Sequence, residues 1–208
     1  MSEIEKNTSS PRNGNRSIDF FRGFLRNPGG VGSVIPSSRF LERQILRAAG
    51  LESAKCLVEL GPGTGGTTAR FLEALPADAH LLAIETDGDF VELLRRNITD
   101  PRLKVFHGSA EHISDALAQF ELPAADAVIS GIPFSTIPEP IGQAITASVF
   151  NALAPGGRFV AYQFRGHVAR RAEHVFGSPE ATHAEFLNIP PMRVYRWTKP
   201  AVNGQPRD

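Results

Sequence analysis

Apolar runs and helical patterns alternate along this chain. Short apolar runs rich in Leu, Val, Ile and Ala predict buried strands, because they are bounded by turn residues. These runs occupy residues 57–60, 81–84, 103–106, 125–129 and 159–164. Helical periodicity from Thr67 to Leu75 separates the first two runs, and another helical pattern, Arg39 to Ala49, precedes them. Strands that alternate with helices predict an α/β fold with a mostly parallel sheet.

A glycine-rich turn follows the first apolar run. The sequence from 57 to 66 reads Leu-Val-Glu-Leu-Gly-Pro-Gly-Thr-Gly-Gly, and the second apolar run ends in Glu85. Glycines let backbone and ligand approach closely, and an acid at this spacing can accept both hydroxyls of a ribose. The turn is neither a phosphate-binding loop ending in Gly-Lys-Ser/Thr nor a typical dinucleotide fingerprint. We therefore expect a nucleotide-like ligand.

The Glu-Leu-Gly-Pro-Gly-Thr-Gly stretch resembles the first motif of class I S-adenosylmethionine-dependent methyltransferases. The resemblance covers about residues 30 to 198. It implies a Rossmann-like, mostly parallel seven-stranded sheet whose terminal antiparallel hairpin uses residues 184–189 and 192–198. It also implies S-adenosylmethionine as cofactor, with Glu59 near its methionine part and Glu85 on its ribose. The alternative is a Rossmann domain that binds a nicotinamide cofactor or has no catalytic role.

The same resemblance extends to the later strands. His107-Gly108-Ser109-Ala110 stands where the family meets the adenine, and Leu153-Ala154-Pro155-Gly156-Gly157 is a frequent companion turn. The residues expected to bind the cofactor are Glu59, Gly61, Pro62, Gly63, Gly65, Glu85, Thr86, Ser109, Ala110 and Ser130.

Length and composition favour one α/β domain with a short N-terminal extension. The single cysteine, Cys56, excludes an internal disulfide and is expected to be a buried apolar filler. No apolar stretch approaches the ~20 residues of a spanning helix, the N-terminus lacks a signal-peptide pattern, and no paired Cys or His spacing suggests a metal. We expect a disordered tail at 1–15, an amphipathic extension and lid at 16–39, the methyltransferase domain at 40–199, and a loose tail at 200–208.

The net charge of zero hides an uneven distribution. Residues 1–39 hold six Lys/Arg and three Asp/Glu, residues 40–157 hold eight and fifteen, and residues 158–208 hold eight and four. The body is therefore acidic and both ends are basic. A protein that binds ribosomal RNA is more often basic overall, whereas basic ends are compatible with anionic lipid or phosphate groups. Ordinary solvated charge explains the pattern equally well.

The N-terminal extension carries an amphipathic pattern. Ser17 can cap a helix in which Ile18, Phe21 and Leu25 recur at helical spacing, before Pro28-Gly29-Gly30 ends it. This helix either covers the domain's own cleft or lies in a membrane interface, and the two roles are compatible. The residues expected at the membrane are Phe20, Phe21, Arg22, Phe24, Leu25 and Arg26.

Two enzyme classes share the next stretch. Gly32-Ser33-Val34-Ile35-Pro36-Ser37-Ser38-Arg39 resembles bacterial phospholipid N-methyltransferases, and related sequence occurs in ribosomal RNA adenine dimethyltransferases. Ser37 or Ser38 would cap the helix that begins at Arg39, and its N-terminus could face the cofactor carboxylate or a substrate phosphate. A cap without a ligand is the alternative.

The segment after the fourth run distinguishes these classes. Enzymes that methylate exocyclic amino groups of bases usually carry Asn/Asp/Ser-x-Pro-aromatic there, and the aromatic residue stacks on an extruded base. This chain has Gly131-Ile132-Pro133-Phe134, so the first position has no side-chain acceptor, although Ser130 is adjacent. The phospholipid enzymes resemble this apolar segment better. Simple packing is the alternative role for Phe134.

Tyr162 follows at the end of the fifth run, ahead of a basic helix. Tyr162 could orient an amine, and Arg165, His167 or Arg170 could hold a lipid phosphate, although exposed helical charge is the simpler explanation for each. The expected catalytic residues are Tyr162, Ser130 and Phe134. The expected substrate-binding residues are Ser37, Ser38, Ile132, Pro133, Phe134, Tyr162, Arg165 and His167.

The sequence thus predicts a monomeric enzyme that methylates the amine of phosphatidylethanolamine and its mono- and dimethyl derivatives toward phosphatidylcholine. We expect it on the inner face of the cell membrane as a peripheral protein, without nucleic acid or metal. The alternatives are an RNA adenine N6-methyltransferase, for which salt-sensitive RNA binding would be expected, and a non-catalytic cofactor-binding module.

Overall fold

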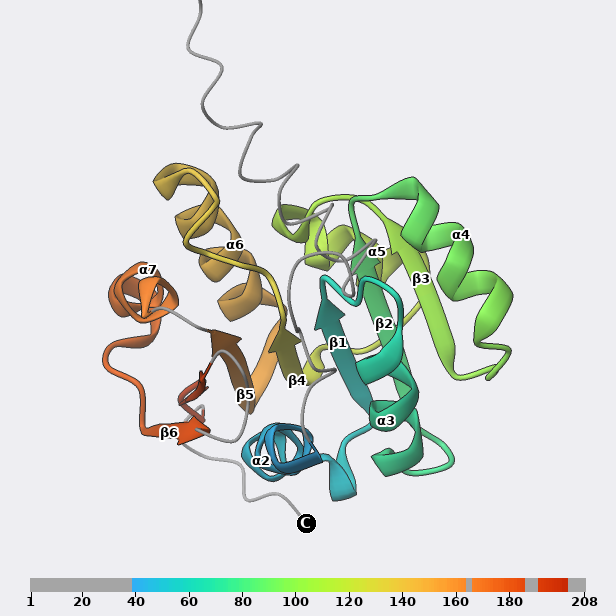
Figure 1. The fold of residues 1–208 in the computed structure, drawn as a ribbon, viewed down its shortest axis with the longest axis horizontal. Coiled ribbons are helices and arrows are strands. Elements are labelled where there is room, and N and C mark those ends of the chain that lie inside the picture. The colour runs from blue at the N-terminus through green and yellow to red at the C-terminus, as the bar shows by residue number, and fades with distance from the viewer. Residues whose placement is uncertain (1–38, 164–165, 186–190, 202–208) are drawn as a thin grey trace, which may run out of the picture.

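The computed structural model describes residues 39–163, 166–185 and 191–201 (Figure 1). The expectations for the tail and amphipathic extension before Arg39, for Arg165 and for the tail after residue 201 lie outside these residues. The strands are β1 (Cys56–Leu60), β2 (His80–Glu85), β3 (Leu103–His107), β4 (Ala125–Ser130), β5 (Leu153–Gln163), β6 (Ala181–Glu185) and β7 (Met192–Thr198). They form one seven-stranded sheet in the order β3-β2-β1-β4-β5-β7-β6.

The expected fold class is confirmed by this topology. Strands β1 to β5 pair in parallel, while β7 runs antiparallel to both β5 and β6. The strand order reverses at β1, whose neighbours are β2 and β4. Open α/β sheets bind ligands at such a switch point, beyond the carboxyl ends of the strands.

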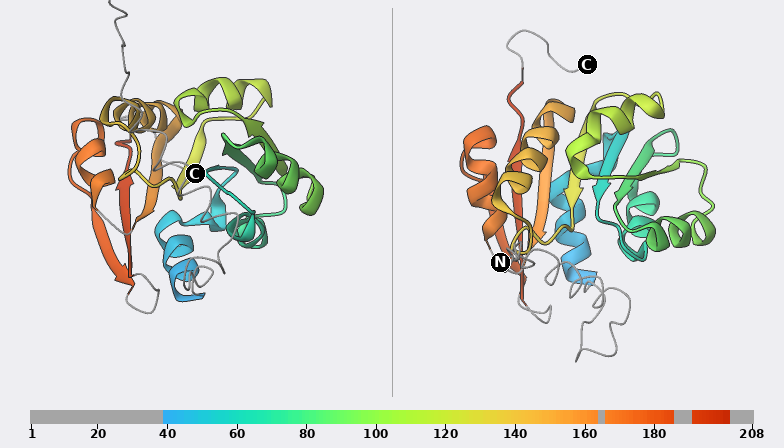
Figure 2. Two further views of the ribbon diagram at one scale, coloured as in Figure 1. Left: turned by 45° about the horizontal axis from the view of Figure 1, so that its top comes forward. Right: turned by 90° about the horizontal axis from the view of Figure 1, so that it is seen from above.

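Helices cover both faces of the sheet (Figure 2). One group contains α2 (Arg39–Ala49), α3 (Gly66–Ala74) and α4 (Gly88–Asn97), and the other contains α5 (Ile113–Gln119), α6 (Glu139–Ala152) and α7 (His167–Phe176). Short 3₁₀ turns lie at Leu51–Ser53 and Ala110–His112. The expected helices at 39–49 and 67–75 agree with α2 and α3 to within one residue.

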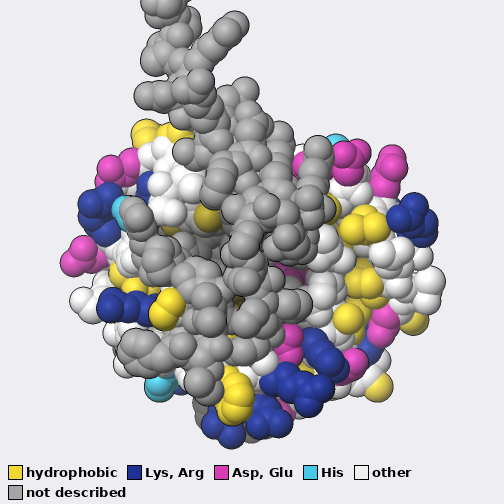
Figure 3. All heavy atoms as spheres, viewed as in Figure 1, with side chains coloured by type: hydrophobic (Ala, Val, Ile, Leu, Met, Phe, Trp, Pro, Cys, Tyr) yellow, Lys and Arg dark blue, Asp and Glu magenta, His cyan; other side chains and the backbone are white. Residues whose placement is uncertain are grey.

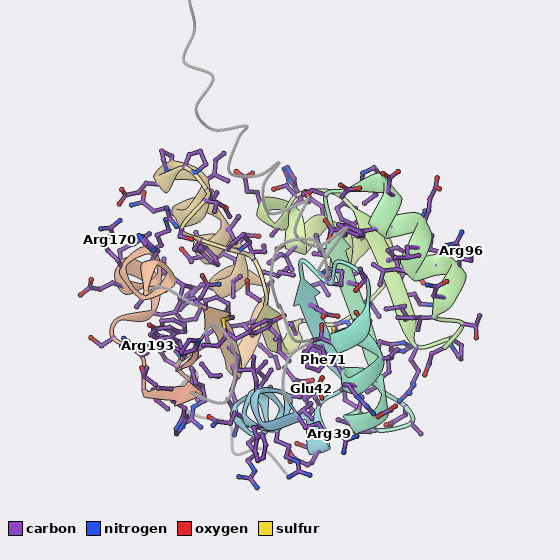
Figure 4. All side chains as sticks on the ribbon, viewed as in Figure 1. Arg39, Glu42, Phe71, Arg96, Arg170 and Arg193 are labelled. Carbon is purple, nitrogen blue, oxygen red and sulfur yellow. The ribbon has the colours of Figure 1, made fainter. Side chains whose placement is uncertain are left out.

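Alternation along the strands divides the core into two layers. In β1, Val58 and Leu60 face the α5, α6 and α7 side, while Leu57 packs with residues of α2 and α3. Phe71 of α3 is fully buried in this second layer and lies near Glu42 of α2, where the two helices meet (Figure 4). Glu59 shares the face of Leu57, so it points toward α3.

Two strands begin well before the predicted start. β5 begins at Leu153 and includes the Pro-Gly-Gly turn, because Ala125 of β4 already pairs with Leu153 before a register shift. The first strand of the hairpin, β6, begins at Ala181 instead of Ala184. Residues 186–189, which were expected to complete it, lie outside the described residues.

Aromatic rings close the core where β5, β7 and α7 meet. Phe159 is fully buried, with its ring centroid 5.1 Å from that of Trp197 and 5.5 Å from that of Phe176. The indole N–H of Trp197 donates to the carbonyl of Gly177 over 3.1 Å, so its polar atom is satisfied. The cluster holds the antiparallel end of the sheet against α7.

None of the helices within the described ranges is long and apolar enough to cross a membrane.

Replacing Phe159 by Ala is expected to lower the free energy of unfolding by about 3–5 kcal/mol, because the ring is lost from a packed core. Denaturant titration followed by Trp197 fluorescence and circular dichroism would measure the change. The control is Phe40→Ala, since Phe40 is 52% exposed and its loss should change stability by less than about 0.5 kcal/mol. Equal effects of the two substitutions would contradict the assigned core.

Candidate active site

The turn between β1 and α3 depends on glycine. Gly61, Gly63 and Gly65 have φ angles of 71°, 57° and 86°, in the left-handed region that other residues seldom adopt. A Cβ on Gly61 would lie 3.3 Å from Ile132, and one on Gly65 would lie 2.7 Å from Leu94. Gly61 therefore keeps the ligand side open, whereas Gly65 lets the turn pack against α4.

The carboxylate of Glu85 ties this turn to the end of β2. Its Oε2 accepts the backbone N–H of Gly63 at 3.1 Å, and its Oε1 accepts those of Thr86 at 2.7 Å and Asp87 at 2.9 Å. Glu85 is only 7% exposed, yet it lines the cavity described next. Its position at the strand end suits the expected acceptance of ribose hydroxyls.

A cavity of about 190 Å³ lies beyond the carboxyl ends of β1 to β4. Of the residues expected to bind cofactor or substrate, it is lined by Gly61, Glu85, Thr86, Ser109, Ala110, Ile132 and Pro133. The lining is apolar apart from a few polar groups near Glu85, as suits a planar base joined to a sugar. The residues present are compatible with an adenosine group, for which Glu85 would be on the ribose side and Ser109 and Ala110 on the base side.

Sequence reasoning missed several other lining residues. They are Ile84, Asp87, Phe90, Gly108, Thr136, Ile137, Ile141 and Ile145. Two signals could have found some of them. Asp87 precedes a glycine and caps α4 by accepting from the N–H of Asp89, and Ile141 and Ile145 are one helical turn apart.

Glu59 lies beneath the turn and is 1% exposed. Its Oε1 and Oε2 accept the hydroxyl protons of Thr67 and Thr68, each over 2.7 Å. Burial raises the pKa of Glu59 from 4.5 to about 7, while these two hydrogen bonds lower it and the nearby Glu85 carboxylate raises it. The Glu59 side chain is not part of the cavity lining, so the described cavity does not include the expected contact between Glu59 and the cofactor's methionine part.

Three of the expected cofactor residues act through the backbone or lie below the surface. Pro62 is buried, and its carbonyl accepts the N–H of Gly65 at 3.1 Å. Gly63 contributes its N–H to Glu85. Ser130 is fully buried, and its hydroxyl accepts the N–H of Ile132 at 3.3 Å, which shapes the segment after β4.

The expectation that Phe134 meets the substrate is not supported by its position. Its ring is fully buried in the core, and the guanidinium carbon of Arg171 lies 5.9 Å from its centroid. The cause is the hydrogen-bonding of its loop: the N–H of Phe134 donates to Gln163, and Gln163 in turn donates to the carbonyl of Ile132. These bonds turn the aromatic side chain inward, so packing is its observed role.

Tyr162 lies against Gly131. A Cβ on Gly131 would lie only 2.4 Å from the Tyr162 hydroxyl oxygen, so the phenol occupies the space that a side chain at position 131 would need. Burial raises the pKa of Tyr162, and the Glu59 carboxylate adds to this effect, while a hydrogen bond with Thr67 opposes it. The phenol therefore stays protonated at neutral pH.

The remaining residues expected to bind the substrate do not line the cavity or lie outside the described residues. His167 begins α7 and does not line the cavity. Arg170 is exposed on the same helix. Ser37, Ser38 and Arg165 lie outside the described residues.

A second hollow, of about 350 Å³, lies beside the edge strand β3. Its lining includes Arg95, Leu103 and Phe120. None of the described residues that line it belongs to the glycine turn or to the carboxyl ends of β1, β2 and β4, so the cavity beside Glu85 is the better candidate. No group of three or more metal-ligating side chains occurs among residues that the structure describes.

Comparison with known proteins agrees with this site. Residues 57–157, from β1 into β5, match the model of the family described as "Methyltransferase domain". Ornithine lipid N-methyltransferase from Singulisphaera acidiphila is 29% identical over 177 residues, which cover 85% of this chain and 92% of that protein. Ribosomal RNA small subunit methyltransferase A from Alcanivorax borkumensis is 42% identical over 79 residues, but these cover 38% of this chain and 25% of that protein.

Solved structures agree on the fold. The N-methyltransferase NodS from Bradyrhizobium japonicum, in complex with S-adenosylhomocysteine, has a TM-score of 0.70 at 14% identity and covers 90% of this chain and 99% of that one. The [4+2]-cyclase SpnF has a TM-score of 0.68 at 12% identity, covering 94% and 98%. A cyclase carries out a different reaction, so the fold alone does not define the chemistry.

The fold, the site and the family match together support the interpretation of this chain as a class I S-adenosylmethionine-dependent methyltransferase. The same findings support S-adenosylmethionine as its cofactor.

Glu85→Gln is expected to weaken binding of S-adenosylhomocysteine by roughly 10- to 100-fold, because hydrogen bonds to a charged group contribute about 1.5–3 kcal/mol. Isothermal titration calorimetry measures the affinity, and thermal unfolding checks that the glycine turn remains folded. Glu92→Gln is the matched control, since Glu92 is exposed on α4 outside the cavity lining. An unchanged affinity in folded Glu85→Gln protein would remove Glu85 from the binding site.

Proposed function

We propose that this protein transfers methyl groups from S-adenosylmethionine to the amine of a membrane lipid. The observation that carries the proposal is the similarity to ornithine lipid N-methyltransferase along 85% of this chain and 92% of that protein. Phosphatidylethanolamine and its mono- and dimethyl derivatives are the proposed acceptors, and ornithine lipid is the related acceptor that the similarity suggests.

The end of β4 supports a small amine as the acceptor. Gly131 has no side chain to accept a hydrogen bond from a nucleobase amino group, and Tyr162 fills the space where one would lie. The apolar residues Ile132 and Pro133 line the cavity instead of a stacking ring, because Phe134 is buried. These features suit a flexible aliphatic amine better than a planar base.

The cofactor supplies, when bound, a methyl group activated by a positively charged sulfur. The protein must therefore position a neutral amine behind that methyl group and exclude water. A lipid amine is largely protonated at neutral pH, since its pKa is near that of lysine, so a proton has to leave first. Tyr162, whose hydroxyl lies beside Gly131 at the end of β4, is a polar side chain that could orient the amine.

Two alternative functions are distinguished from lipid methylation by the methyl-transfer assay described below. Partial similarity to ribosomal RNA methyltransferases favours an RNA adenine N6-methyltransferase as the second candidate, although this chain spans only a quarter of the Alcanivorax borkumensis protein. A non-catalytic cofactor-binding module is the third. It would bind S-adenosylmethionine and transfer nothing to lipid or RNA.

The surface of α2 supports contact with an anionic membrane. Arg39, Arg43 and Arg47 are spaced four residues apart, so they lie on one exposed face of the helix, and Phe40 beside them is 52% exposed. Lys and Arg side chains gather over α2 and α3 at the lower edge of the molecule in Figure 3. Together with the N-terminal segment before Arg39, this basic face of α2 is the proposed attachment to the inner face of the cell membrane.

Full-length protein is expected to transfer labelled methyl groups to phosphatidylethanolamine or ornithine lipid in vesicles that contain anionic lipid. Thin-layer chromatography of the labelled products would identify the acceptor and the number of methyl groups. Ribosomal RNA and small ribosomal subunits serve as competing acceptors under the same conditions. Label in RNA alone would replace the lipid proposal by the second candidate, and cofactor binding without any labelled acceptor would favour the third.

The double variant R43Q/R47Q is expected to bind anionic vesicles roughly 30-fold more weakly, since each basic residue near such a surface contributes about 1 kcal/mol. Vesicle sedimentation at low and high salt measures the binding. R96Q/K104Q removes the same charge from α4 and β3, away from α2, and is expected to bind like the wild type. Equal losses in both variants would show a general charge effect and contradict a docking face on α2.

A further inference from the structure

The loop between β4 and α6, residues 131–138, forms one wall of the cavity. Four of its residues line the cavity: Ile132, Pro133, Thr136 and Ile137. The ring of Phe134, between them in sequence, is instead fully buried in the core. The position of this wall therefore depends on the side chains that hold the loop from its core side.

Gln163 holds the first half of this loop. It is the last residue of β5 and is 4% exposed. Its Oε1 accepts the N–H of Phe134 at 3.3 Å, and its Nε2 donates to the carbonyl of Ile132. A carboxylate in this place would accept but not donate, and an apolar side chain would do neither. An amide is thus the side chain that satisfies both backbone groups.

Arg171 of α7 holds the second half. Its Nη2 donates to the carbonyl of Ile137 at 2.7 Å, and its guanidinium carbon lies 5.9 Å from the centroid of the Phe134 ring. A cation at this distance from an aromatic ring is attracted to it. One side chain therefore contacts both a residue of the cavity wall and the buried ring behind that wall.

Stability alone does not account for an arginine at position 171. The residue is only 5% exposed, and its Nε and Nη1 have no hydrogen-bond partner among the residues that the structure describes. Burial of a charge with unpaired donors is costly, and an apolar side chain of similar size is often at least as stable. The contacts with the loop are what the guanidinium adds.

Helix α6 leaves room for this arginine. A Cβ on Gly142 would lie 2.5 Å from Cδ and 2.7 Å from Nε of Arg171. Alanine forms helices better than glycine, so a glycine inside α6 weakens the helix while it keeps this space open. The hydroxyl of Thr146, one turn further along α6, donates to the carbonyl of Arg171 at 3.0 Å. Together these contacts fix where α7 presents the arginine.

We propose that Gln163 and Arg171 are positioning residues that clamp the β4–α6 loop and thereby hold its cavity face in place against the acceptor lipid. Neither residue lines the cavity, so both act through the loop. This inference rests on the proposed function, because it takes a lipid amine as the acceptor. A small displacement of that wall would move the amine out of line for methyl transfer.

Amide hydrogen exchange tests the clamp without any acceptor. The Phe134 N–H is expected to exchange slowly in the wild type, because it donates to a buried side chain. Q163M and R171M should speed this exchange by at least about 10-fold, since either change frees part of the loop. E173M makes the same kind of replacement on the exposed face of α7 and should behave like the wild type. Wild-type exchange in Q163M or R171M would overturn the clamp whatever the acceptor is.

Kinetics separate positioning from a structural role. Q163M and R171M are expected to lower kcat with lipid by roughly 10- to 100-fold, because a misplacement of about 1 Å can cost 100-fold in rate. Affinity for S-adenosylhomocysteine, measured by calorimetry, should stay unchanged, since Glu85 and the glycine turn are untouched. R171K keeps a donor for the carbonyl of Ile137 and should recover part of the loss.

Thermal unfolding of the same variants completes this comparison. R171M should unfold at no lower temperature than the wild type, because it removes a buried charge with unpaired donors. A loss of stability in parallel with activity would make Arg171 a structural residue and overturn the proposal. An equal loss of S-adenosylhomocysteine affinity would also overturn it, because the loop would then serve the cofactor.

G142A displaces the arginine without removing its charge. The added methyl group would overlap Arg171, so we expect faster exchange at Phe134 and a lower kcat, as in R171M, although alanine favours the helix. Wild-type exchange and kcat in G142A would contradict the clamp. If the wild type methylates neither phosphatidylethanolamine nor ornithine lipid, the proposed function is wrong, and hydrogen exchange still decides whether the clamp exists.

Discussion

The hydrogen bonds of the Glu85 carboxylate hold the site together. By accepting N–H groups from Gly63, Thr86 and Asp87, one side chain fixes both the turn after β1 and the start of the loop after β2. The turn can follow this path because its glycines adopt left-handed φ angles. The shape of the cavity and the burial of Glu59 both depend on the turn keeping this conformation.

Local sequence predicted most of the sheet. Each parallel strand is an apolar run that must be covered on both faces, so its type and approximate position follow from composition and the adjacent turns. The ends of the strands were harder to predict than their positions. β5 starts early because Leu153 pairs with Ala125 across a register shift, and such pairing depends on a partner strand far away in sequence.

Some of the residues that line the cavity were predicted from backbone geometry and spacing. Gly61, Glu85, Ser109 and Ala110 line the cavity because strand ends place them there. The inward turn of Phe134 was not predictable, since it depends on Gln163, a residue distant in sequence. The contact between Tyr162 and Gly131 likewise joins β5 to β4, and only the folded chain brings these residues together.

The position of β7 affects how the protein is made in the cell. This strand is formed by residues 192–198, yet it lies inside the sheet, between β5 and β6. While the ribosome is still synthesising those residues, the outer edge of β5 has no partner strand, and Phe159 lacks the indole ring that later covers it. An unpaired strand edge is a template for association with other chains, so the nascent polypeptide is most vulnerable to aggregation just before β7 leaves the exit tunnel.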